Sequence, residues 1–153
     1  MIDRRRLLAG AGGLAAIAVV PLPAAATPAD AAAAITEAFG DDRPFTDGPI
    51  IIEAPALAET GNSVPITVRA ERAMDAPDRI TRMALFSENN PRAALFAVSF
   101  GPAAAEAAIA TNIRLNGTQQ IICVAETADG TLIRAIHEIR VVVSACTTLE
   151  AQF

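Results

Sequence analysis

The sequence has no lysine, tryptophan or tyrosine, and it holds one histidine and two cysteines in 153 residues. All twelve basic residues are arginines, and acidic residues outnumber them, so the formal net charge is −5. An acidic, aromatic-poor surface argues against nucleic acid as a partner. One imidazole and two thiols are too few for an ordinary three- or four-ligand metal site, and no carboxylates at useful spacing complete one. We therefore expect no metal and no cofactor.

Residues 1–26 have the pattern of an export signal. Three arginines ending at Arg6 precede an apolar stretch that runs to Leu22, and Ala24-Ala25-Ala26 offers small residues to a signal peptidase. The Arg-Arg-x-Leu-Leu order fits the twin-arginine form. The apolar stretch is shorter than the roughly 20 residues of a spanning helix. We predict cleavage near Ala26, a periplasmic location and no membrane anchor after cleavage.

Residues 27–46 predict a short helix followed by a loop. Asp30 is expected to cap the helix, alanines fill it up to Phe39, and Gly40 is expected to end it.

From residue 47 onward, short runs with strand character alternate with turn residues. We predict seven strands, at residues 49–53, 63–71, 79–87, 95–100, 108–115, 119–127 and 132–143. In the third strand, Ile80, Ala84 and Phe86 are expected on one face. This spacing predicts an all-β, immunoglobulin-like antiparallel sandwich of about seven strands over residues 47–143.

Three turn signals join these strands. Asn89-Asn90-Pro91 is expected to turn the chain after the third strand. Asn116-Gly117 is a strong hairpin signal between the fifth and sixth strands, and Asp129-Gly130 is one between the sixth and seventh.

The last hairpin predicts where the two cysteines lie. With its turn centred on Asp129-Gly130, Cys123 pairs near Ile136 and is expected to pack as a small hydrophobe. Cys146 follows the last strand, in a C-terminal arm of residues 144–153. A disulfide needs Cα atoms within about 7 Å, so we do not expect one between these cysteines.

Cys146 is the candidate site residue. A thiol in a terminal arm is accessible, but no histidine or lysine is adjacent in sequence to lower its pKa. At an ordinary pKa only about 3% is thiolate at pH 7. The residues alone leave two interpretations open, a functional thiol that a partner enzyme activates and an incidental tail cysteine.

The remaining polar residues of the last strand predict no chemistry. His137 shares its face with Ile133 and Ile139 and is expected to pack there, while Glu138 and Arg140 belong to a solvated face with Arg134. The chain has no glycine-rich phosphate loop, no Gly-x-Ser-x-Gly motif and no paired-carboxylate motif. We predict no catalytic residue, and a protein that is not an autonomous enzyme.

Several short segments occur in an order and spacing typical of one family. The most distinctive are Asn90-Pro91-Arg92 and Phe96-Ala97-Val98-Ser99-Phe100. The others are residues 52–55, 59–68, 111–115, 118–120, 125–126, 129–130 and 138–141. Together with the twin-arginine signal they resemble SoxY, the sulfur carrier of periplasmic thiosulfate oxidation.

The resemblance implies an immunoglobulin-like sandwich and a sulfur group held covalently on the cysteine of the C-terminal arm. Cys146 falls on that cysteine, although Ser144-Ala145 and Thr147-Thr148 replace the glycine pairs that flank it in the family. The implied partners are a SoxZ-like subunit, in a heterodimer, and periplasmic sulfur-oxidising enzymes. Two alternatives remain: an accessory or scaffold subunit of another periplasmic oxidation system, and a thiol-dependent sulfurtransferase.

Overall fold

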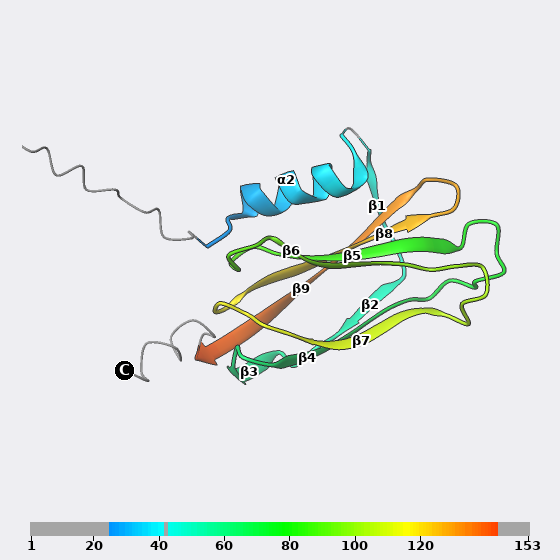
Figure 1. Ribbon diagram of the computed structural model, residues 1–153. Coiled ribbons are helices and arrows are strands. Elements are labelled where there is room, and N and C mark those ends of the chain that lie inside the picture. Colours follow the sequence, from blue (N-terminus) through cyan, green and yellow to red (C-terminus); the bar gives the residue numbers. More distant parts are fainter. Residues whose placement is uncertain (1–24, 42, 144–153) are drawn as a thin grey trace, which may run out of the picture.

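The structure, a computed structural model, describes residues 25–41 and 43–143, which form one helix and nine strands packed as a sandwich (Figure 1). The elements are α2 (Pro28–Phe39), β1 (Phe45–Asp47), β2 (Ile50–Glu53), β3 (Leu57–Thr60), β4 (Val64–Ala70), β5 (Ile80–Ser87), β6 (Ala94–Ser99), β7 (Ala107–Ile113), β8 (Gln119–Thr127) and β9 (Leu132–Val143). The predicted all-β sandwich with a short N-terminal helix is confirmed.

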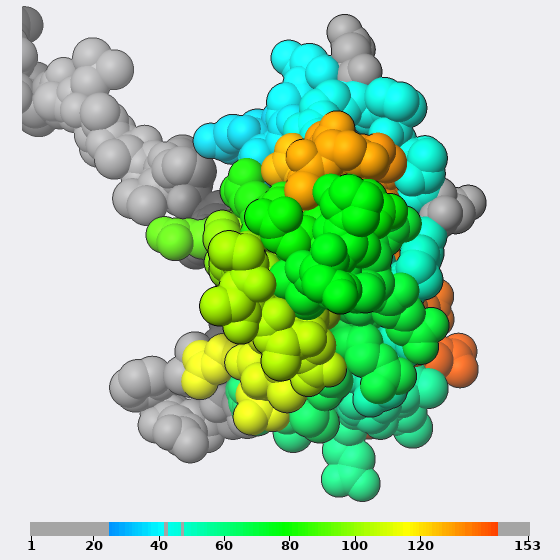
Figure 2. Space-filling view, turned by 90° about the vertical axis from the view of Figure 1, so that its right-hand side faces the viewer, coloured from blue at the N-terminus to red at the C-terminus, as the bar shows by residue number. Residues whose placement is uncertain are grey.

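Two sheets form the sandwich. The larger one has the strand order β1-β9-β8-β5-β6, with β3 also paired to β9, and the smaller one has the order β2-β4-β7. Figure 2 views the end at which the loop before β5, the loop before β7 and the β8–β9 turn lie. The ends of β5 and β9 and the start of β8 lie at the other end.

The main core lies between the two sheets. In β4 the alternation of apolar and polar residues places Val64, Ile66 and Val68 in the interior, each almost fully buried. Ile121 on β8 and Ile139 on β9 meet them from the larger sheet. Each such side chain contributes about 1.5–3 kcal/mol when it leaves water, so the alternating pattern is enough to specify which face is inside.

Helix α2 covers part of the outer face of the larger sheet. Its buried residues Ala31, Ile35 and Phe39 form a second core with residues of β5 and β8. The ring of Phe39 packs edge-on against that of Phe86, with 6.4 Å between centroids. The prediction that Asp30 caps the helix was wrong. Thr27 is the cap, and Asp30 closes a capping box by accepting the Thr27 N–H at 2.8 Å.

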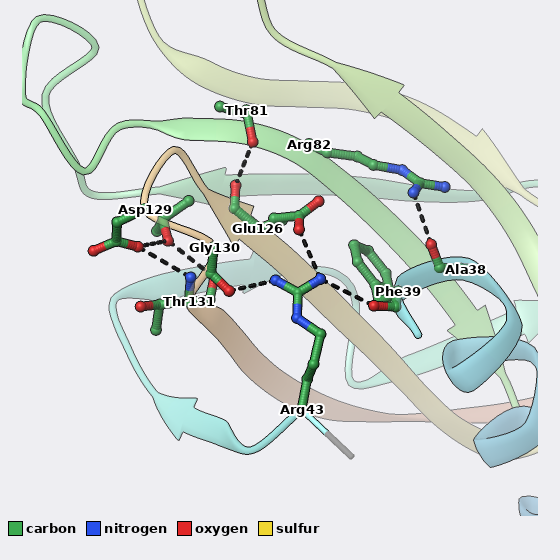
Figure 3. Close-up of polar contacts among 10 residues, drawn as sticks. Ala38, Phe39, Arg43, Thr81, Arg82, Glu126, Asp129, Gly130 and Thr131 are labelled. Atoms are coloured by element: carbon green, nitrogen blue, oxygen red, sulfur yellow. Dashed lines mark hydrogen bonds and ion pairs between the residues drawn. The ribbon is translucent and has the colours of Figure 1, made fainter. Parts of the chain in front are cut away.

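Two arginines from outside the helix bind the carbonyl groups at its C-terminal end (Figure 3). Arg43 donates to the carbonyl of Phe39 at 2.9 Å, pairs with Glu126 at 2.8 Å and also bonds the carbonyl of Gly130. Arg82 donates to the carbonyl of Ala38 at 2.8 Å. These cations satisfy carbonyls that have no partner within the helix, and they attach its end to the β8–β9 hairpin and to β5.

The seven predicted strands are all present, and two further strands were missed. β1 and β3 have three and four residues. Both pair with β9 in parallel, β1 along its first residues and β3 along its last. They carry too few residues for an alternating pattern, and the length of β9 provides the edge to which they add.

Two sequence interpretations were wrong in detail. Asn116-Gly117 is a turn, and Gly117 has a φ of 94°, but it joins β7 of the smaller sheet to β8 of the larger one instead of forming a hairpin. In β5, a register shift between Ile80 and Arg82 places Ile80 in the main core, whereas Ala84 and Phe86 face the helix. An added residue in a strand reverses the faces of all that follow.

Within residues 25–41 and 43–143, no helix is long and apolar enough to cross a membrane. The predicted signal lies almost entirely outside the described residues.

Candidate functional site

β9 ends at Val143, the last described residue before the predicted C-terminal arm. β8 pairs with β9 only as far as Ile139, which lies opposite Gln119. The last four residues of β9 therefore need other partners. β3 provides them along one edge, where it runs parallel to β9 and places Thr60 opposite Val143. We call the end of β9, β3 and the residues that hold them the arm base.

Hydrogen bonds fix the arm base on both sides of β9. The carbonyl of Val143 accepts a hydrogen bond from the N–H of Gly61 at 2.8 Å, just after β3. On the side of β8, the hydroxyl of Thr118 accepts the N–H of Val141 at 3.0 Å. A side-chain oxygen thus continues the ladder beyond the first residue of β8. The backbone is held up to the last residue before the arm.

A network of amide side chains supports the loop that carries this threonine. Asn90, in the β5–β6 loop, accepts the N–H of Asn116 at 2.8 Å and the amide of Gln119 at 3.0 Å, and it donates to the carbonyl of Arg114 at 2.7 Å. Asn89 donates its N–H to Gln119 at 3.0 Å. Asn90 and Gln119 are buried, so the network joins two loops rigidly.

The sequence predicted each of these loops only as a turn. That they meet was missed, because β5 and β8, which carry them, are neighbours in the larger sheet but are far apart in the sequence. The signal that was present is the recurrence of amide side chains in both turns, at residues 89–90 and 116–119.

Apolar side chains are exposed beside the arm base. Leu57 on β3 and Val142 on β9 expose 60% and 66% of their surface, and Val143 exposes 44%. Glu59 and Arg140, also exposed, lie among them on the two paired strands. The surface beside the arm base is therefore a mixture of aliphatic and charged side chains.

Cys123 is a free thiol in the main core, with 1% of its surface exposed. Its burial raises the pKa of the thiol to about 12, because the thiolate would lose its hydration. The prediction that it packs as a small hydrophobe is confirmed. Its partner on β9 is Ala135 and not Ile136. The turn between the paired Glu126 and Leu132 has an odd number of residues, which moves the register by one.

The other predicted site residue, Cys146, lies outside the described residues. Its role, and the absence of a disulfide to it, stay predictions.

His137 is half-buried on the inner face of β9, and its Nε2 has no hydrogen-bond partner among the described residues. Arg134, Glu138 and Arg140 are exposed on the opposite face, as expected. In the part of the chain that the structure describes, no three histidine, cysteine or acidic side chains lie together in a way that could hold a metal ion.

Comparison with known proteins gives a family match. The chain matches the model of the family described as sulfur oxidation protein SoxY over residues 35–146, that is, up to and including Cys146. No curated protein matches the sequence.

The structure is similar to the sulfur carrier protein SoxY from Chlorobium limicola f thiosulfatophilum. The two share 25% identity with a TM-score of 0.62, over 74% of this chain and 96% of that one. Superoxide reductase (neelaredoxin) from Ignicoccus hospitalis is also similar, with 22% identity and a TM-score of 0.55, over 76% of this chain and 94% of that one. The second likeness shows the fold alone.

Proposed function

The chain belongs to the SoxY family of sulfur oxidation proteins, and from that premise we propose that it carries a sulfur group covalently on Cys146. Its likeness to a sulfur carrier protein supports a carrier role and not that of an enzyme. In this role the sandwich holds the arm in place. Partner enzymes carry out the reactions on the group that the arm presents.

The observation that carries the proposal is the contrast between the two thiols. Cys123 is enclosed in the core, and burial raises its pKa to about 12, so it is a poor nucleophile in the folded protein. Cys146 is the only other thiol, and it follows Val143 by three residues. Three residues of chain reach at most about 11 Å, so a group on Cys146 stays tethered close to the arm base.

The attachment of thiosulfate to Cys146 is one example of the proposed reaction. The thiol of Cys146 loses its proton, its sulfur forms a bond to the outer sulfur of thiosulfate, and a cysteine S-thiosulfonate results. One proton and two electrons leave in this step, so an electron-transfer enzyme among the partners must accept the electrons. The sequence around Cys146 has no histidine or lysine to activate the thiol, which assigns that activation to the partner as well.

The family acts in periplasmic sulfur oxidation, and the finer points of location and assembly are part of the proposal. We expect twin-arginine export, with removal of residues 1–26, and a heterodimer with a SoxZ-like subunit. The Arg4-Arg5 pair and the small residues up to Ala26 support the export.

Intact-mass measurement tests the carrier role. The protein is isolated from the periplasm of cells given thiosulfate, with and without a reductant. We expect a mass increase that the reductant removes. The Cys146→Ser variant should not show this increase, and the Cys123→Ala variant should show it as the wild type does. A bare thiol at Cys146 under all growth conditions, or only an ordinary disulfide, would contradict the proposal.

A second candidate is an accessory or scaffold subunit in which the cysteine is dispensable. The replacement of the family's glycine pairs by Ser144-Ala145 and Thr147-Thr148 favours it, because β-branched threonines make an arm bulkier and stiffer. A Cys146→Ser strain decides between the two. Full sulfur oxidation in that strain supports the scaffold, and loss of oxidation with a folded protein supports the carrier.

A further inference from the structure

The chain contains one Asn-Gly pair, Asn116-Gly117, in the turn between β7 and β8. An asparagine that precedes glycine is chemically labile, because glycine has no side chain to hinder attack of its backbone nitrogen on the asparagine side chain. The next residue is Thr118, whose hydroxyl accepts the N–H of Val141 at the arm base. A chemical change at residue 116 would therefore occur close to the residue that holds the end of β9.

The reaction open to this pair is deamidation. The backbone nitrogen of Gly117 loses its proton and forms a bond to Cγ of Asn116, while the bond from Cγ to Nδ2 breaks and this nitrogen leaves as ammonia. The succinimide ring that results takes up one water molecule and opens to aspartate or isoaspartate. Ring closure requires rotation about ψ and χ1 of Asn116, because only this rotation brings the two reacting atoms together.

Asn89 holds the two groups of Asn116 that this rotation must move. Nδ2 of Asn89 donates to the backbone carbonyl of Asn116 at 2.6 Å, which opposes rotation about ψ. Nδ2 of Asn116 donates to the backbone carbonyl of Asn89 at 3.2 Å, which opposes rotation about χ1. Asn90 also accepts the N–H of Asn116 at 2.8 Å. Both loops lie at the end of the sandwich at which β9 ends (Figure 1).

We infer that Asn116 is a deamidation site whose rate is set by its reciprocal hydrogen bonds with Asn89, and that its modification loosens the arm base. The reaction proceeds only when the loop opens locally, so it is slower in the folded chain than in an unfolded one. The product does not return to the same closed arrangement. A carboxylate at residue 116 has no hydrogen to donate, and its oxygen would face the carbonyl oxygen of Asn89 where the amide nitrogen now lies.

The modification acts on β9 through a short stretch of chain. Thr118 is separated from the modified residue by Gly117 alone, and the carbonyl of Gly117 accepts the side-chain amide of Gln119 at 3.3 Å. When the contact between the two loops is lost, the hydroxyl of Thr118 is held less firmly, and the N–H of Val141 is more often exposed to water. No step involves Cys146, so the inference does not depend on the carrier role.

Peptide mapping of the exported chain measures the rate. The chain is kept at mildly alkaline pH with a reductant. Trypsin, which cuts after Arg114 and Arg134, then releases a fragment in which Asn116 is the only asparagine. The same fragment, kept free in solution, gives the rate without the fold. We expect deamidation in the folded chain to be at least about tenfold slower than in the free fragment. Equal rates in the two would overturn the inference.

Removal of the Asn89 side chain tests the reciprocal hydrogen bonds directly. Asn89→Ala removes the donor to the carbonyl of Asn116 and should raise the rate in the folded chain by roughly three- to tenfold, the effect of one lost hydrogen bond. Asn112→Ala, at an exposed position on β7, is the matched control and should keep the wild-type rate at residue 116. Thermal unfolding verifies that both variants are folded. A rate that Asn89→Ala leaves unchanged overturns the inference.

Asn116→Asp reproduces one of the two products and tests the effect on β9. Amide exchange at Val141 should be at least roughly threefold faster in this variant than in the wild type. Asn112→Asp adds the same charge at an exposed position on β7 and should exchange at Val141 as the wild type does. The inference also fails if exchange at Val141 does not differ between these two variants.

Discussion

The hydroxyl of Thr118 and the backbone N–H of Val141 lie 3.0 Å apart, so a side chain holds β9 where β8 has ended. The hydrogen bond fixes the end of β9, from which the proposed carrier arm continues. The stability of this region can be measured separately from the stability of the whole fold.

Replacing Thr118 with valine keeps the shape and removes the hydrogen-bond acceptor. Because the site is exposed, we expect a modest loss of about 0.5–1.5 kcal/mol. Amide exchange at Val141 should become faster, by roughly tenfold for each 1.4 kcal/mol of local stability lost. Thr118→Ser keeps the hydroxyl and should exchange as the wild type does. Unchanged exchange at Val141 in the valine variant would show that the hydroxyl does not hold β9.

Alkaline pH should destabilise the fold through Cys123. The raised pKa means that its neutral form is favoured in the folded state, so the stabilisation is complete below the unfolded pKa of 9.0 and is lost as pH rises toward about 12. The chain has no lysine or tyrosine, so in a Cys146→Ser background no other side chain loses its proton in this range. The free energy of unfolding should fall by about 1.4 kcal/mol per pH unit above 9.0.

Denaturant titrations between these pH values measure the effect. The control is Cys123→Ala in the same background, which should show a lower stability but no such slope. Equal slopes in the two proteins would assign the pH dependence to another group.

Gly48 cannot accept a side chain. A β-carbon placed on it would lie 2.2 Å from Cγ2 of Ile133, a buried residue of β9. We expect Gly48→Ala to lower the free energy of unfolding by about 1–3 kcal/mol, since either the backbone at residue 48 or the side chain of Ile133 must move. Gly101→Ala is the control, because nothing lies within 4 Å of a β-carbon there, and its effect should stay within about 0.5 kcal/mol. Similar melting temperatures for both variants would be inconsistent with this packing.

The amide network around the buried Asn90 should contribute measurably to stability. Asn90→Leu leaves the carbonyl of Arg114 and the N–H of Asn116 without their partner, at a cost of about 1–3 kcal/mol per buried group. Asn112→Leu changes an exposed asparagine on β7 and should have little effect. Chemical denaturation of the two variants gives the comparison. Equal losses would mean that the network adds no stability.

The sequence predicted seven strands from local signals, which are apolar or alternating runs bounded by turn residues. In β4, Val64, Ile66 and Val68 alternate with polar or exposed residues, and burial follows the pattern residue by residue. β1 and β3 could not be predicted in this way. They exist because β9 is long enough to accept a short parallel strand at each end, which is a property of the assembled sheet.

Local signals also failed where strands change sheets or carry an extra residue. Asn116-Gly117 has the chemistry of a hairpin turn, but which strand follows in space depends on β4 and β5, far away in sequence. The shift after Ile80 likewise depends on its pairing with β8. For the candidate site, the sequence and the family resemblance predict Cys146, while the hydrogen bonds around Val143 became visible only in the fold.

The pairing of β9 has a mechanical consequence. A force applied to the chain beyond Val143 and directed along β9 would act on the pairing of this strand. β3 lies parallel to this end of β9, and β8 lies antiparallel to the part before it. A pull in that direction loads the hydrogen bonds between β9 and its neighbours in shear. These bonds then share the force at the same time, and they do not open one after another from an end. The sandwich can therefore act as a firm anchor under tension.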